Sequence, residues 1–171
     1  MRGTEYFQSA WVVESLDEAM AYWTKICGVG PFYVIPDCAI ENYAYRGQSG
    51  GGLRFSGALA QAGPIQIELI QQHGDDPSAY RDVYPSGTGG FHHVCAFARD
   101  YDADVERYRL AGAPIAHSGQ FGDMRFCYLD TRSAMGCMTE LIEDRQSIRD
   151  MFAVVANAAI DWDGSDPIRY L

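Results

Sequence analysis

Hydrophobic and polar residues alternate in several short stretches of this chain. Residues 5–13 and 90–98 show this alternation and are rich in aromatic and β-branched side chains, which predicts two strands. Apolar residues at helical spacing follow each strand, which predicts a helix that begins after Ser15 and another over about 101–111. Ser15 and Glu18 have the spacing of a capping box, so we expect both to stabilise the start of the first helix.

Three more strands follow each predicted helix. We expect strands at residues 32–35, 53–60 and 64–71 in the first half, and near Ile115 and at 123–129 and 136–142 in the second. Glycines make residues 37–52 irregular, which predicts a loop or lid, and residues 73–89 are rich in glycine and proline, which predicts a linker. The order is therefore β-α-β-β-β in residues 1–72 and again in residues 90–143.

The two halves also match in sequence. The first strands align at an offset of 85 positions, which pairs Gln8 with His93, and the last strands align at an offset of 72, which pairs Glu68 with Glu140. One insertion within residues 37–52 of the first half accounts for the difference of 13 positions. We therefore predict an internal duplication of one βαβββ module.

Residues 144–171 lie outside this duplication. An apolar stripe at helical spacing predicts a C-terminal amphipathic helix, formed by Ile148, Met151, Phe152, Val155 and Ala159. Such a stripe packs within the chain or forms the face of a homodimer. The polar tail from Asp161 is expected to run along the surface or along a partner.

Composition and charge narrow the function classes. The 171 residues carry a net charge of -10 and one lysine, Lys25, so the surface repels phosphate backbones and anionic membranes, and we expect neither as a partner. The N-terminal residues 1–5 contain no apolar signal core, and no apolar run is long enough to span a bilayer. Five cysteines without a C-x-x-C pair fit a reduced, cytoplasmic protein.

Each predicted module carries one donor side chain on its first strand and one on its last. A carboxylate on a hydrophobic strand is costly to bury unless it is paired or bound to a cation, which singles out Glu68 and Glu140. A single histidine on an apolar strand is more often a core residue, but the match of His93 with Gln8 favours a ligand. Strict alternation places His92 on the face of the strand opposite to His93. His73 and His117 lie near turns and are predicted to be exposed, with a place at the border of the pocket as the alternative.

The stretches FQSAWVVESLDEAMAYW, IQIELIQ, GFHHVCAFARD and GCMTELIE, in this order and spacing, resemble the vicinal oxygen chelate superfamily over about residues 5–143. This superfamily includes glyoxalase I, methylmalonyl-CoA epimerase, extradiol dioxygenases and bleomycin-resistance proteins. The resemblance implies an α+β fold in which two βαβββ modules form curled mixed sheets around a shared cleft. It also implies a divalent metal held by Gln8, Glu68, His93 and Glu140, a set similar to that of the zinc form of glyoxalase I.

The resemblance leaves three functions open. The first is a metal-dependent lyase or isomerase of the glyoxalase or epimerase type, in which Glu140 or Glu68 moves a proton of a small carbonyl substrate and the metal stabilises an enediolate. The second is a protein that binds a hydrophobic or aromatic molecule without turnover. The third is an iron-dependent dioxygenase, which is disfavoured because Gln8 stands where a second histidine ligand is needed.

The ligand types do not choose among Zn²⁺, Ni²⁺, Co²⁺, Mn²⁺ and Fe²⁺. The residues predicted to border the substrate are Phe55, Arg54, Arg125 and Tyr128. Relatives that use glutathione or CoA carry basic residues for the carboxylates or phosphates of these carriers. The candidates here are Arg46, Arg54, Arg125 and Arg132, which form no cluster in the sequence, so the sequence leaves open whether such a carrier is involved.

Overall fold

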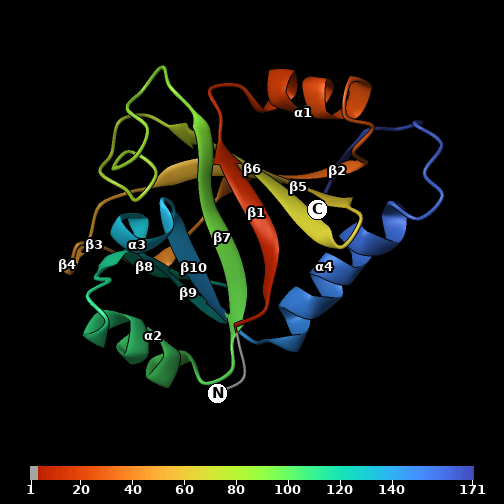
Figure 1. The fold of residues 1–171 in the computed structure, drawn as a ribbon. Coiled ribbons are helices and arrows are strands. Elements are labelled where there is room, and N and C mark those ends of the chain that lie inside the picture. Colours follow the sequence, from red (N-terminus) through yellow and green to blue (C-terminus); the bar gives the residue numbers. More distant parts are fainter. Residues whose placement is uncertain (1–3) are drawn as a thin grey trace.

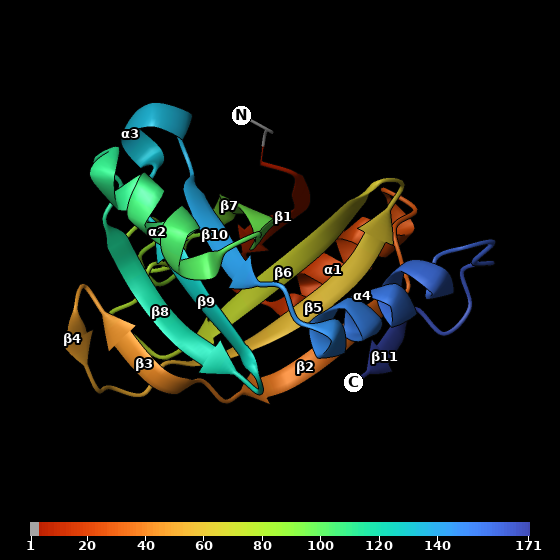
Figure 2. The ribbon, with the colours of Figure 1, turned by 90° about the horizontal axis from the view of Figure 1, so that it is seen from below.

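The computed structural model describes residues 4–171; residues 1–3, part of the stretch where we predict no signal segment, lie outside the described range. Eleven strands of this range form one curled mixed sheet in the order β11-β2-β5-β6-β1-β7-β10-β9-β8-β3-β4 (Figures 1 and 2). The strands β1 and β7 run side by side through its centre (Figure 1). The predicted α+β class is thereby confirmed.

The first module occupies one half of the sheet. Its elements are β1 (Tyr6–Val12), α1 (Leu16–Lys25), β2 (Phe32–Cys38), β5 (Arg54–Ala62) and β6 (Ile65–His73). The helix α1 begins as predicted, because the hydroxyl of Ser15 accepts a hydrogen bond from the Glu18 backbone N–H at 3.2 Å. Between β5 and β6 the chain reverses at Gly63, whose φ of 58° lies in the left-handed region that glycine adopts at little cost.

The second module repeats this arrangement in the other half. Its elements are β7 (Gly90–Ala98), α2 (Tyr101–Leu110), β8 (Ile115–Phe121), β9 (Met124–Leu129), α3 (Arg132–Met135) and β10 (Met138–Glu143). The carboxylate of Asp100 caps α2 by accepting from the Ala103 N–H at 3.1 Å. The sequence pattern did not predict α3, a single turn of helix between two strands.

The strand register supports the predicted duplication. Glu68 of β6 lies opposite Ala10 of β1, and Glu140 of β10 lies opposite Cys95 of β7, so the offsets of 85 and 72 hold in both ladders. Where the modules meet, the antiparallel pair β1–β7 sets Ala10 opposite His93. This pairing relates the two modules by an approximate two-fold axis.

The segment at residues 37–52 is not the irregular loop that its glycines suggest. It contains β3 (Glu41–Tyr45) and β4 (Gln48–Ser49), and β3 pairs with β8 of the second module. The strand pairing makes Tyr33 equivalent to His117, which is 84 positions later in the chain. It makes Leu59 equivalent to Tyr128, which is only 69 positions later. The extra length of the first module therefore lies in this segment, which extends the sheet of the second.

The C-terminal segment closes the structure beside the first module. The helix α4 (Gln146–Ala158) lies along β5 and buries Ile148 and Val155, as the apolar stripe predicted (Figure 2). The polar tail ends in β11 (Ile168–Tyr170), a short strand parallel to β2 at the edge of the sheet. This tail, which was expected to run along the surface or along a partner, is mostly exposed and adds a short strand that the sequence pattern did not predict.

The apolar side chains of residues 4–171 form three clusters that follow the two faces of the sheet. On the outer face, α1 packs on β2, β5 and β6, and α2 packs on β9 and β10. A larger cluster fills the concave side and includes Tyr80 from the linker, Tyr128 from β9 and Ile148 from α4. Gln8, Glu68 and Glu140 line a cavity together with these three residues of the larger cluster.

Candidate metal centre

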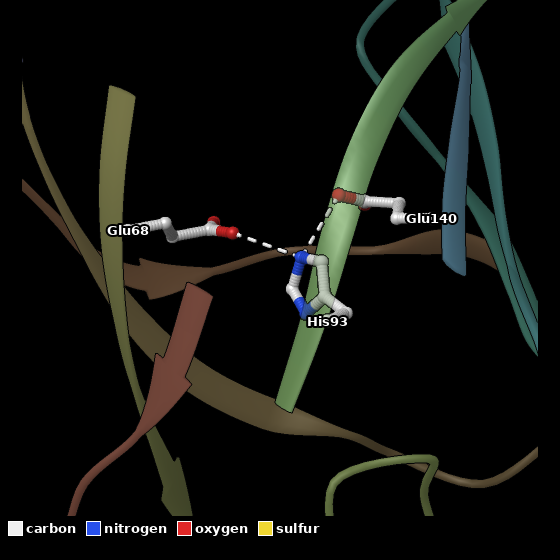
Figure 3. Close-up of side chains that lie close together, drawn as sticks. All are labelled: Glu68, His93 and Glu140. Atoms are coloured by element: carbon white, nitrogen blue, oxygen red, sulfur yellow. Dashed lines mark ion pairs between the residues drawn. The ribbon is translucent and has the colours of Figure 1, made fainter. Parts of the chain in front are cut away.

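Two carboxylates and one imidazole converge on the concave side of the central strands. The Nε2 atom of His93 lies 3.4 Å from Glu68 Oε2 and 3.3 Å from Glu140 Oε2 (Figure 3). One ligand atom of each residue lies within 4.8 Å of the others. The residues come from β7, β6 and β10, so both modules contribute to the cluster.

These groups are buried without being satisfied. His93 is fully buried, and the side chains of Glu68 and Glu140 are 17% and 11% exposed. Within the described residues, His93 Nε2 and Glu68 Oε2 have no hydrogen-bond partner of good geometry. Charge-assisted hydrogen bonds are normally about 2.7–2.9 Å long, and leaving such atoms unpaired in a core is costly. A divalent cation between the three groups would satisfy them, so the residues present fit a metal.

Gln8 is the fourth residue of the predicted set. It is 3% exposed and lines the same cavity as Glu68 and Glu140. Its Nε2 donates to Gln66 Oε1 at 2.7 Å, which fixes the amide and leaves its oxygen for another partner. The geometry therefore places all four predicted ligands around one space, and ligation itself remains a proposal.

Burial and the neighbouring charges shift the pKa values of His93 and Glu68. Burial alone would lower the pKa of His93, but its contacts with Glu140 and Glu68 outweigh burial and raise the pKa to about 9. Burial raises the pKa of Glu68, and the negative charge of Glu140 adds to the rise, while the contact with His93 opposes it. Without a metal, His93 thus carries the proton that holds the two carboxylates together.

Strict alternation predicted that His92 lies on the face of the sheet opposite to His93. This prediction is wrong, because both rings lie on the same side. The register between β1 and β7 shifts between Ala10 and Trp11, which pair with His93 and Phe91, so His92 is the extra residue of a β-bulge. Its ring is fully buried and its Nδ1 lies 3.0 Å from the Nδ1 of His93. The bulge therefore sets two neighbouring imidazoles against each other.

Hydrogen bonding fixes which nitrogen of His93 faces the carboxylates. The Ala79 carbonyl can only accept, so His92 Nε2, at 2.9 Å, must donate to it. Burial lowers the pKa of His92 well below its ordinary value and keeps that ring neutral, so its Nδ1 accepts from His93 Nδ1–H. The Nε2 of His93 is then the nitrogen left for a cation, an arrangement common for metal-binding histidines.

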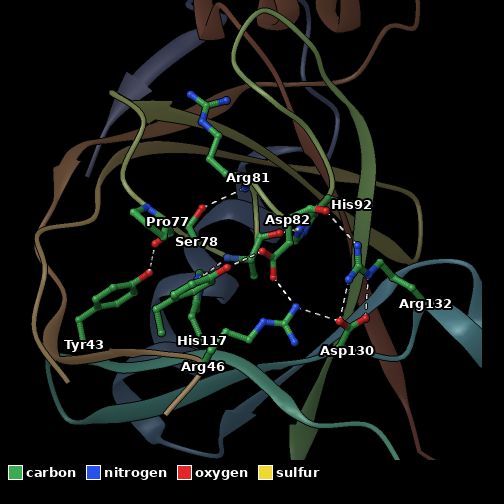
Figure 4. A network of polar contacts seen from close by, with 12 residues as sticks. Tyr43, Arg46, Pro77, Ser78, Arg81, Asp82, His92, His117, Asp130 and Arg132 are labelled. Atoms are coloured by element: carbon green, nitrogen blue, oxygen red, sulfur yellow. Dashed lines mark hydrogen bonds and ion pairs between the residues drawn. The ribbon is translucent and has the colours of Figure 1, made fainter. Parts of the chain in front are cut away.

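The linker supplies the peptide that anchors this chain of hydrogen bonds (Figure 4). The Ala79 N–H donates to the Nδ1 of His117 at 3.1 Å, and His117 is fully buried on β8 rather than exposed as predicted. Burial lowers the pKa of His117 to about 3. The sequence pattern missed Ala79 and its neighbour Tyr80, because the surrounding glycines and prolines indicated an exposed connection.

The concave cluster encloses a cavity next to the three charged groups. Two of the predicted pocket residues, Phe55 and Tyr128, line this cavity together with Glu68 and Glu140. The two predicted arginines lie elsewhere. The side chain of Arg54 is 70% exposed and pairs with Asp37, and Arg125 is 41% exposed and pairs with Asp102 and Glu143.

The fold and this cluster define a class: duplicated βαβββ proteins with a candidate divalent-cation centre between the modules. A family model of the Glyoxalase/Bleomycin resistance protein/Dioxygenase superfamily matches residues 7–128. The chain belongs to this superfamily, as the sequence motifs predicted. No helix in residues 4–171 is both long and apolar enough to cross a membrane.

Solved structures share the fold at low sequence identity. A hypothetical protein from Bacillus halodurans C-125 is 15% identical with a TM-score of 0.56, and the match covers 85% of this chain and 97% of the other. Methylmalonyl-CoA epimerase from Mycobacterium tuberculosis is 18% identical, with a TM-score of 0.56 and coverage of 88% and 97%. A variant of Streptomyces coelicolor methylmalonyl-CoA epimerase, in complex with 2-nitronate-propionyl-CoA, is 19% identical, with a TM-score of 0.57 and coverage of 84% and 96%. No curated protein sequence matches the chain.

Proposed function

We propose that this protein is a metal-dependent enzyme that moves a proton on the carbon beside a carbonyl group, as a lyase or an isomerase. The observation that carries the proposal is the buried group of Glu68, His93 and Glu140, in which His93 Nε2 and Glu68 Oε2 lack hydrogen-bond partners. Catalysis of this kind needs a base beside a group that stabilises negative charge on the substrate oxygen.

The chain offers two candidates for the base. Glu68 and Glu140 both line the cavity, on either side of His93. The raised pKa of Glu68, caused mainly by burial, makes this carboxylate a stronger proton acceptor than an ordinary glutamate. His93, Gln8 and the second carboxylate would hold the cation, which supplies Lewis-acid polarisation of the carbonyl oxygen.

Metal binding is tested first, on protein stripped of metal and titrated with Zn²⁺, Ni²⁺, Co²⁺, Mn²⁺ or Fe²⁺ (anaerobically for iron). We expect one ion per chain, and a loss of at least tenfold in affinity for Glu140→Gln and Glu68→Gln. Glu106→Gln is the matched control, because Glu106 lies on the surface of α2 and pairs with Arg109. Absence of stoichiometric binding by any of these ions would contradict the proposal.

Proton transfer is tested by NMR in deuterated water. A panel of small α-hydroxycarbonyl and 1,2-dicarbonyl compounds is incubated with metal-loaded protein, and exchange of the hydrogen beside the carbonyl is followed. We expect exchange with at least one compound, and its loss in Glu68→Gln or Glu140→Gln.

A second candidate is a binding protein without turnover, which the largely apolar lining of the cavity favours. It predicts tight binding of an apolar compound that is insensitive to chelators, with no hydrogen exchange. Ring-cleaving iron oxygenation is not our proposal, because the described cluster holds one imidazole where such iron sites use two histidines and a carboxylate.

A further inference from the structure

The cavity beside the charged cluster carries no positive charge of its own. Among the described residues that line it, none is a lysine or an arginine, and the ionisable lining groups are carboxylates, thiols and phenols. Four arginines adjoin lining residues in the sequence, and all four have other partners: Arg54, Arg125 and Arg149 pair with carboxylates at the surface, and Arg81 donates to the Gly74 carbonyl. A cation bound by Glu68 and Glu140 would be neutralised largely by those two ligands. An anionic substituent on a substrate would therefore find no counter-charge here.

Aliphatic and aromatic side chains together form most of the cavity wall. The aromatic lining residues are Phe55, Tyr80, Phe121, Phe126, Tyr128 and Phe152. The rings of Phe55 and Tyr80 meet edge to face at 5.8 Å, and those of Phe126 and Tyr128 do so at 6.1 Å. Edge-to-face contacts of this kind are also favourable with the ring of a ligand. Met151 and Phe152 of α4 complete one side, so the helix outside the duplication shapes the cavity.

One pair of hydroxyl groups interrupts this apolar wall. The hydroxyls of Tyr80 and Tyr128 lie 3.2 Å apart, both residues are almost fully buried, and both line the cavity. In such a pair one O–H donates to the other oxygen. The second O–H has no other acceptor among the described residues, so its hydrogen is available to an oxygen atom in the cavity. Tyr128 also lies directly opposite Glu140 across the β9–β10 ladder.

We propose that the cavity selects an uncharged α-hydroxyketone or 1,2-dicarbonyl compound that bears an aryl group, with the Tyr80–Tyr128 pair donating a hydrogen bond to one of its oxygens. This inference rests on the proposed function, and it adds the substrate class and the residues that select it. The aryl group lies against the aromatic wall, and the vicinal oxygens face Glu68, Glu140 and the tyrosine pair. The phosphates of a CoA ligand such as that of the Streptomyces relative would find no positive side chain among the residues that line this cavity.

Three matched probes test the substrate class, with metal-loaded protein and calorimetry or NMR as the readout. They are hydroxyacetone, 2-hydroxyacetophenone and 4-(2-hydroxyacetyl)benzoate, which share the vicinal oxygens and differ in the aryl group and in charge. We expect 2-hydroxyacetophenone to bind at least tenfold more tightly than hydroxyacetone, because the phenyl ring buries more apolar surface. The carboxylated probe should bind at least tenfold more weakly than the uncharged aryl compound.

Tyr80→Phe and Tyr128→Phe test the hydroxyl pair. Each should weaken 2-hydroxyacetophenone binding by about three- to fifteenfold, the usual effect of losing one hydrogen bond, while the metal affinity changes less than twofold. Tyr43→Phe is the control, because the Tyr43 hydroxyl is also largely buried but donates to the Pro77 carbonyl and does not line the cavity. It should leave binding of all three probes unchanged.

Two outcomes overturn the inference while leaving the proposed function standing. In the first, metal binds and hydrogen exchange occurs, but hydroxyacetone or the carboxylated probe binds as well as 2-hydroxyacetophenone. In the second, Tyr80→Phe, Tyr128→Phe and Tyr43→Phe have equal effects. Failure of the proposed function is distinct, because the protein would then bind no metal and catalyse no exchange with any probe.

Discussion

His93 lies fully buried between two carboxylates, and its surroundings determine how it binds a proton or a metal ion. Its Nδ1 faces His92 and its Nε2 faces Glu68 and Glu140. A proton and a divalent cation compete for the same nitrogen, because a histidine ligand must be neutral at the coordinating atom. The proton affinity of this one ring therefore controls the metal affinity that we propose.

Metal binding should accordingly depend on pH. The pKa of His93 is raised to about 9, so the ring is protonated below that pH and neutral above it. Affinity should rise on the order of tenfold per pH unit from pH 7 toward pH 9 and then level off. Calorimetry in buffers of different ionisation enthalpy should show about one proton released per metal at pH 7. Equal affinities at pH 7 and pH 9.5 would contradict the model.

The tautomer of His93 gives a second prediction at this scale. His92→Phe removes the acceptor of His93 Nδ1–H and the donor to the Ala79 carbonyl, and it should lower metal affinity by about 10- to 100-fold. His117→Phe, which removes the other ring bonded to the Ala79 peptide, should change metal affinity less than threefold. Nitrogen-15 NMR of the metal-loaded wild-type protein should show His92 protonated at Nε2 and His93 protonated at Nδ1. If both variants lose the same affinity, the role of His92 is only structural.

At the scale of elements, the linker between the modules is a buried part of the site. Residues 78–84 form a helical turn, in which the N–H groups of Asp82 and Tyr84 donate to the carbonyls of Ser78 and Tyr80. An ion-pair network holds this turn from outside: Arg46 after β3 contacts both Asp82 and Asp130, as Figure 4 shows. The insertion of the first module therefore helps to position Ala79 and Tyr80.

Loss of this network should loosen the linker without unfolding the sheet. Arg46→Ala removes both ion pairs and should lower the free energy of unfolding by about 1 kcal/mol, since the Arg46 side chain is 33% exposed and solvent screens the pairs. Amide hydrogens of residues 78–84 should exchange faster with deuterium, measured by mass spectrometry. Arg107→Ala removes a surface pair with Asp104 on α2 and should leave the exchange of this segment unchanged. Equal effects of the two variants would show that the network does not hold the linker.

At the scale of the whole molecule, the candidate ligands link the two modules. Gln8 and Glu68 belong to the first module, and His93 and Glu140 belong to the second. A cation bound by all four would stabilise the pairing of β1 with β7 as well as each module. Any ligand that binds only the folded state adds stability in proportion to the logarithm of its concentration.

Metal binding should therefore raise the melting temperature of the whole chain. At a free metal concentration of 100 times the dissociation constant, the gain is about 2.7 kcal/mol, or about 5–10 °C for a protein of this size. Calorimetry should show one transition that moves as a unit, because the ligands come from both modules. The double variant Glu68→Gln, Glu140→Gln should show no shift. A shift in only part of the transition would indicate that one module binds the metal alone.

The internal similarity of the sequence predicts the duplication and the positions that are equivalent in its two copies. Periods of two and 3.6 residues identified most strands and all but the shortest helix, because each element buries one face. The offsets of 85 and 72 matched Gln8 with His93 and Glu68 with Glu140 before any strand was paired, and the strand register agrees with both offsets. Similarity within the chain carries this information, since equivalent strands of a duplicated module occupy equivalent places.

The surroundings of those positions depend on contacts between segments that are far apart in the sequence. The bulge that turns His92 toward His93 arises from the pairing of β7 with β1, and alternation along one strand does not reveal it. His117 and Tyr80 are buried because β3, the linker and β9 come together around them. These three segments are far apart in the sequence. Burial and hydrogen bonding depend on such long-range contacts, whereas periodicity records only which face of an element is apolar.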